Sequence, residues 1–68
     1  MAKKNYPMWH IRFTNARNKF LSACEEMEQA WFEDGHNSEF KKLYDQMWEL
    51  YSKVCDKQTE NYKRLGIM

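Results

Sequence analysis

Two long segments without Gly or Pro meet in the middle of the chain at Asp34-Gly35-His36-Asn37-Ser38. Glycine adopts the left-handed conformation that ends many helices, and Asn or Ser often caps the helix that follows. Pro7 and Gly66 stand at the outer ends of the two segments, where a first helical turn and a helix end accept them. The sequence therefore predicts helix, turn and helix. The expected bounds in a single domain over 1–68 are helix about 7–34, turn 35–38 and helix about 38–65, with 1–5 and 66–68 flexible.

Apolar residues recur in both segments at gaps of three and four, as on one face of a helix. The first series is Trp9, Phe13, Ala16, Phe20, Cys24, Met27 and Trp31. The second series is Phe40, Leu43, Tyr44, Met47, Leu50, Tyr51, Val54, Gln58, Tyr62 and Leu65. Because the turn is short, the helices are expected side by side and antiparallel, with residue numbers that add up to about 74 facing one another. The predicted fold is all-α, an antiparallel two-helix hairpin with these stripes as its core.

One local pattern competes with the first helix. Trp9, Ile11 and Phe13 alternate with their neighbours as in a strand, and Thr14 could then begin a shorter helix. A lone strand would have no partner, which favours the helix. Whether residues 8–13 are helical or extended stays open at this point.

The predicted second helix carries more apolar surface than one neighbour can cover. At about 100° per residue its apolar positions span an arc of roughly 160°, which is wider than a single helix–helix seam. A chain of 68 residues is also short for a stable monomer. We therefore expect a homodimeric four-helix bundle, with a surface for a different protein as the open alternative. On the first helix Leu21 and Phe32 lie on a flank away from the stripe, and Ile11 lies nearly opposite it. The candidate dimer or partner interface is Ile11, Leu21, Phe32, Trp48 and Leu50.

Charge is separated along the chain, although the net charge is only +1. In the hairpin, residues 1–20 and 51–68 share one end, with nine basic and two acidic side chains. Residues 21–50, at the turn end, carry eight acidic and two basic side chains. An antiparallel dimer would place each basic end beside an acidic one. The basic end, whose aromatic neighbours would also suit RNA or a nucleotide, includes Arg12, Arg17, Lys63 and Arg64.

The sequence offers no credible set of catalytic or metal-binding residues. His10 and His36 are expected on the surface at opposite ends of the hairpin, too far apart to share a metal. Cys24 and Cys55 are offset by about five residues after pairing, roughly 7 Å along the axis, which does not suit a disulfide. Both are therefore expected as buried reduced thiols. We expect no enzymatic activity, no metal and no cofactor.

Hydropathy and the start of the chain narrow the class of protein. No apolar run is long enough to cross a membrane, and residues 1–5 do not lead into a secretory signal, so a cytoplasmic protein without a membrane partner is expected. The sequence predicts a small non-enzymatic helical protein that binds another protein stoichiometrically. Such an inhibitor or adaptor is of the kind that phages and plasmids encode against a host factor. The alternative is an RNA- or nucleotide-binding dimer that uses its basic, aromatic end.

Overall fold

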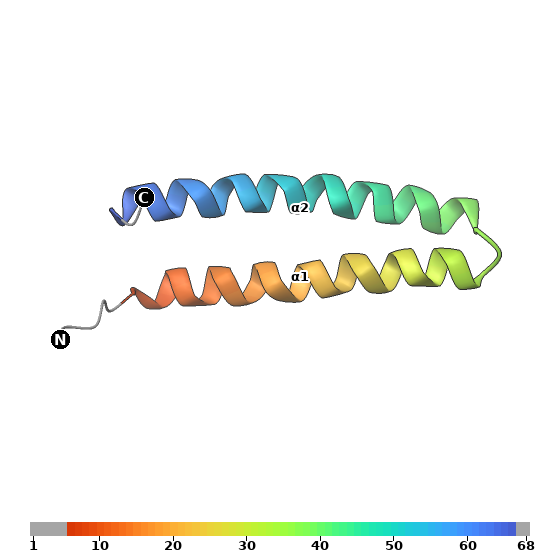
Figure 1. Cartoon of the computed structure of the whole chain (residues 1–68), viewed down its shortest axis with the longest axis horizontal. Coiled ribbons are helices and arrows are strands. Elements are labelled where there is room, and N and C mark those ends of the chain that lie inside the picture. Colours follow the sequence, from red (N-terminus) through yellow and green to blue (C-terminus); the bar gives the residue numbers. More distant parts are fainter. Residues whose placement is uncertain (1–5, 67–68) are drawn as a thin grey trace.

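The computed structural model describes residues 6–66, which form two helices, α1 (Met8–Glu33) and α2 (Ser38–Arg64). The helices pack side by side and antiparallel in a single layer, joined by the turn (Figure 1). The predicted all-α hairpin is confirmed, and its helix bounds agree with the expected ones to within about a residue or two.

The structure of α1 and of the end of α2 bears on two expectations about the ends of the chain. Residues 8–13 belong to α1, so the extended alternative is wrong. The expectation of flexible ends at 1–5 and 66–68 falls, apart from Gly66, outside the described residues. Gly66 has a left-handed φ of 74° just after α2, which is the conformation expected of a glycine at a helix end.

The turn ends α1 and caps α2 by the predicted chemistry. Gly35 and His36 have φ angles of 67° and 62°, in the left-handed region where glycine is at no steric disadvantage. The side-chain oxygen of Asn37 then accepts hydrogen bonds from two backbone N–H groups of the first turn of α2, at 2.9 and 3.1 Å. Asn37, and not Ser38, is therefore the N-cap.

Aromatic pairs fix the register of the two helices. Three pairs of rings connect α1 with α2 at centroid distances of 5.4, 6.4 and 5.2 Å, in order from the turn: Trp31 with Tyr44, Phe20 with Tyr51, and His10 with Tyr62. Edge-on and tilted contacts at these distances are favourable. The helices therefore pair in the order that the sequence predicts.

The interior between the helices is thinner and more polar than expected. Among the described residues, Cys24 is the one fully buried apolar side chain. The other buried side chains are polar, namely His10, Gln58 and Asn61. The side-chain amide of Gln58 donates to the Thr14 hydroxyl across the interface, at 2.9 Å. Polar side chains thus occupy the seam between the helices in the half of the hairpin away from the turn.

Several sequence expectations about burial are wrong, among them the core position of Leu50, which is 53% exposed. Trp9 and Leu43, expected in the core, are 41% and 47% exposed, and Ala16 is exposed as well. His10, expected on the surface, is buried. For the α1 residues the reason is that this helix is rotated about its axis relative to the expected orientation, which turns His10 and Thr14 toward α2 and leaves part of the apolar stripe on a flank. One neighbouring helix cannot enclose a stripe of this width.

Candidate functional site

Two grooves on the described part of the hairpin bear on its function. The apolar groove, of about 280 Å³, is lined by Phe13, Ala16, Arg17, Phe20, Leu50 and Val54. The open-end groove, of about 210 Å³, is lined by Tyr6, His10, Ile11, Thr14, Asn15 and Tyr62. At about 100° per residue, the exposed α1 positions of one groove lie roughly 150° around the helix from those of the other. The two grooves therefore open on opposite faces of the hairpin.

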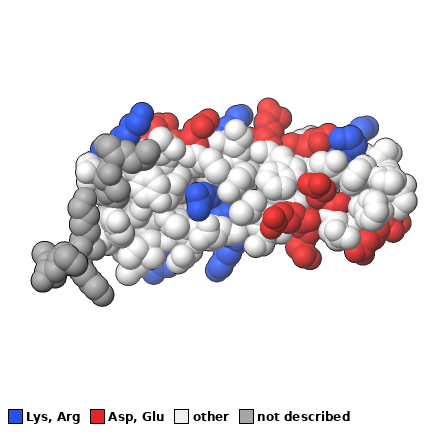
Figure 2. Space-filling view, in the orientation of Figure 1, with Lys and Arg blue, Asp and Glu red and all other residues white. Residues whose placement is uncertain are grey.

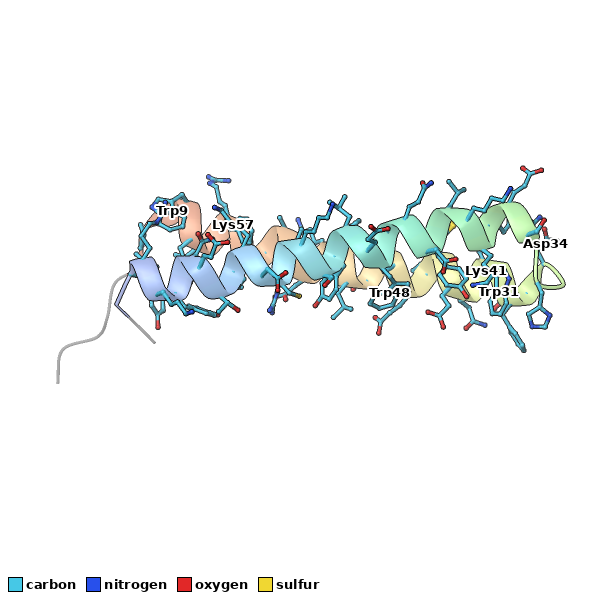
Figure 3. The ribbon with its side chains drawn as sticks, turned by 90° about the horizontal axis from the view of Figure 1, so that it is seen from above. Trp9, Trp31, Asp34, Lys41, Trp48 and Lys57 are labelled. Atoms are coloured by element: carbon cyan, nitrogen blue, oxygen red, sulfur yellow. The ribbon has the colours of Figure 1, made fainter. Side chains whose placement is uncertain are left out.

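The apolar groove has large exposed side chains at its edges. Leu50 is 53% exposed, and Ala16 leaves a gap between the half-buried rings of Phe13 and Phe20. Trp9 continues the same row one helical turn before Phe13. In Figure 3 Trp9 lies on one edge of the hairpin and Trp48 on the other. An apolar face thus follows α1 well beyond the groove itself.

The opposite face is partly closed by contacts within the chain. The indole N–H of Trp48 donates to a carboxylate oxygen of Glu28 across the helix seam at 3.0 Å, and its ring lies edge-on to Tyr51 at 5.7 Å. Trp48 and Leu21 are accordingly half-buried. The tryptophan is therefore positioned by a polar contact that apolar periodicity does not reveal.

The five predicted interface residues do not form one patch. Leu50 lies in the apolar groove, Ile11 in the open-end groove, and Phe32 beside the turn, where its ring is 5.3 Å from that of His36. Ile11 and Phe32 are 41% and 58% exposed. The chain therefore presents apolar side chains on both faces of the hairpin.

The basic residues are likewise divided. Arg12 and Lys63 are exposed, whereas Arg17 is half-buried in the apolar groove, with its Nε group lacking a hydrogen-bond partner. The Arg64 guanidinium lies 4.2 Å from the centre of the Trp9 ring, a cation–π contact. Two of the four predicted basic residues are thus held against apolar surface.

Acidic side chains gather near the turn. The face toward the viewer in Figure 2 is the one from which Trp48 projects in Figure 3; its acidic residues cluster over the turn half, and much of the other half is uncharged. A molecule that lies along this face could therefore bind the turn half through basic groups and the other half through apolar contact.

The ionisable groups in the interior show no sign of an activated nucleophile. Cys24 and Cys55 are free thiols, as expected, although Cys55 is only half-buried. Burial, and to a lesser extent the carboxylate of Glu25, raises the pKa of the Cys24 thiol above its ordinary value. A hydrogen bond with Cys55 raises the pKa of Tyr51. Raised pKa values keep both groups protonated near neutral pH, which is the opposite of what a nucleophile requires.

The described part of the chain offers neither a metal site nor a membrane-spanning helix. Within residues 6–66, no three His, Cys, Asp or Glu side chains are placed so that they could hold a metal ion. Neither α1 nor α2 is both long enough and apolar enough to cross a membrane. Comparisons with protein-family models, curated proteins and solved structures find no match to this chain.

Proposed function

We propose that this chain is a non-enzymatic helical protein that acts stoichiometrically by binding another protein, as an inhibitor or adaptor, and that it does so as a homodimeric bundle. The observation that carries the proposal is the imbalance between buried and exposed apolar side chains. Cys24 is fully buried, whereas Phe32, Leu50 and Leu43 are each about half exposed. Large exposed apolar side chains on a small chain are typical of interaction surfaces.

The two parts of the proposal use different faces. Self-association would add the burial that a two-helix unit lacks. Ile11 and Phe32, away from the apolar groove, would remain for the partner protein. Because both side chains are exposed, their removal should leave the hairpin folded and affect binding alone.

The test is affinity capture with the tagged chain from a nuclease-treated lysate of the organism that encodes it. We expect one protein to be recovered in stoichiometric amount, and its recovery to fall at least tenfold with Phe32→Ala or Ile11→Ala. Asp56→Ala, which removes an exposed charge, serves as the matched control and should capture normally. Recovery that is unchanged in both apolar variants would refute the proposed partner surface.

RNA or a nucleotide is the second candidate, favoured by the Arg64 guanidinium on the exposed Trp9 ring at the basic end. Binding of this kind would weaken steeply with salt and would be lost with Arg64→Glu. The acidic turn half opposes it, because the same polyanion would be repelled there. Capture that disappears after nuclease treatment would favour this candidate over protein binding.

A further inference from the structure

We infer that the apolar groove is the seam of the homodimer, and that a second copy of this chain lies across it antiparallel, with the twofold axis beside Phe20 and Leu50. The inference rests on the proposed self-association and specifies its geometry. In this arrangement α1 packs on α1 of the second copy and α2 on α2. The open end of each copy then covers the turn end of the other.

The groove-side residues of α1 have the repeat that such a seam requires. Two rows recur every seven residues on this flank, Phe13 with Phe20 and Met27, and Ala16 with Ala23 and Ala30. A seven-residue repeat keeps a row of side chains facing a neighbouring helix along its whole length. Within the hairpin, His10 and Thr14 face α2, and Phe20 contacts α2 with only one side of its ring, against Tyr51. The row residues Phe13, Phe20 and Met27 remain partly exposed in the single chain. The repeat is therefore left for a second helix.

The rows are centred where a twofold axis needs them. α1 runs from residue 8 to residue 33, so Phe20, the middle member of its row, lies beside the midpoint of the helix. α2 runs from residue 38 to residue 64, and Leu50 lies beside its midpoint. Both residues line the apolar groove. If two antiparallel copies overlap along their full length, the centre of the groove on one copy therefore faces the centre of the groove on the other. An isologous interface requires this arrangement.

Small side chains then leave room for close packing at two levels of the seam. With the axis beside Phe20, α1 residues whose numbers add up to about 40 face one another across the seam. Trp9 lies over Ala30 of the second copy, Phe13 over Met27, and Ala16 over Ala23. Ala30 makes room for the Trp9 ring, and the Ala16–Ala23 level lets the two helices approach closely. A row of three alanines is explained by this partner.

The charges at the rim agree with the same register. In α1, Arg12 faces Glu26 of the second copy. In α2, where facing numbers add up to about 102, Lys53 faces Glu49 and Lys42 faces Glu60. All six side chains are exposed in the single chain; Glu60 also lies 3.5 Å from the Lys57 ammonium of its own copy, as a neighbour on α2. Near the twofold axis, Lys19 faces Lys19 of the second copy. This contact lies at the solvent edge, where repulsion between like charges costs little free energy.

Cross-linking of the unmodified protein tests the geometry directly. Copies of normal and heavy isotope are mixed, treated with a short lysine-specific cross-linker and digested, so that mass spectrometry identifies links between copies. We expect Lys19–Lys19 and Lys53–Lys53 links, because these residues lie within about 3–6 Å along the axis. Lys63–Lys63 links should be absent, because the two residues would be about 36 Å apart.

Each outcome separates the inference from the proposed function. Dimers that give Lys63–Lys63 links would overturn the antiparallel seam and leave self-association standing. A chain that sediments as a monomer at all concentrations would refute self-association itself. Links that match the expected pattern would support both.

A charge exchange tests the register within α1. Arg12→Glu places like charges together twice, and we expect the dimer dissociation constant to rise about three- to tenfold at low salt. Adding Glu26→Arg should restore it, although Arg12 and Glu26 of one copy are about 21 Å apart along α1 and cannot contact each other. A double variant that dimerises no better than Arg12→Glu would overturn the register.

A matched pair of substitutions tests which face forms the seam. Leu50→Asp should raise the dimer dissociation constant at least tenfold, because the residue occurs twice at the axis. Ile11→Asp, a similar change at a similar exposure on the opposite face, should change it less than twofold. The reverse result would place the seam on the Ile11 face and overturn the inference.

Discussion

The turn half and the open half of the hairpin are held together in different ways. In the turn half, residues 21–50, Cys24 is fully buried, Asn37 caps α2, and the ring of Trp31 packs against that of Tyr44. In the open half, the three buried residues are polar, and the buried atoms without a hydrogen-bond partner in residues 6–66 all lie there, on His10, Arg17 and Gln58.

This difference indicates where the single chain is weakest. A buried polar group that lacks a hydrogen bond costs about 1–3 kcal/mol, which is a large part of the stability of a small domain. The turn half satisfies its polar groups locally and packs its rings. The stability of the open half therefore depends more on contacts with another molecule. This agrees with a dimer interface along the apolar groove, which Arg17 lines.

Tyr44 and Tyr62 give the largest expected contrast between the halves. Both are half-buried and both pack against a ring of α1. We expect Tyr44→Ala to lower the free energy of unfolding by about 3 kcal/mol and Tyr62→Ala by only about 1 kcal/mol, since the first ring packs in the better-closed half. Urea unfolding followed by circular dichroism, at one fixed protein concentration, measures both. Equal losses of unfolding free energy would show that the two halves contribute equally to the stability of the hairpin.

Removal of the hydrogen bond between Gln58 and Thr14 should have the next largest effect, in the open half. Thr14→Val removes the acceptor for the buried Gln58 amide, and we expect a loss of about 2 kcal/mol in the free energy of unfolding. Combining it with Gln58→Leu should recover most of that loss, because two apolar groups then replace a polar pair. A double variant that is less stable than Thr14→Val alone would show that the polar seam stabilises the hairpin on balance.

The cap of α2 provides a smaller test in the turn half. Asn37→Ala leaves two backbone N–H groups without their acceptor and should cost about 1 kcal/mol. Ser38→Ala, at the neighbouring position that the sequence also allowed as the cap, should change the unfolding free energy by no more than a few tenths of a kcal/mol. The same urea measurement applies. If Ser38→Ala were the more costly change, the capping role would belong to Ser38.

The hairpin was predictable because its signals are local and periodic. Gly35 and Asn37 act through their own backbone and nearest neighbours, and a short turn leaves two long helices little choice of direction. The register follows from the same geometry, and the Trp31–Tyr44 contact confirms it. These parts of the fold do not depend on what each helix face contacts.

The rotation of α1 was not predictable, because its apolar stripe is wide enough to serve two neighbours. Periodicity shows that Phe13, Ala16 and Phe20 share a flank, but not whether that flank faces α2 or a second chain. The polar seam was missed for the same reason, since the Thr14–Gln58 hydrogen bond joins residues 44 positions apart. Gln58 within an otherwise apolar series was the one available signal.

The reactivity of the two cysteines compares the turn half with the open half without any substitution. Cys24 is buried in the turn half, and Cys55 is half-buried in the open half. The raised pKa of the Cys24 thiol means that folding favours its protonated form, so its contribution to stability is present below its ordinary pKa of 9.0 and is lost as the pH rises through the folded value. At pH 8 the native protein should therefore be alkylated by iodoacetamide at Cys55 at least tenfold faster than at Cys24, and at equal rates in urea, as measured by mass spectrometry. Because alkylation of Cys24 requires the turn half to open, equal rates in the native protein would show that this half opens as readily as the other.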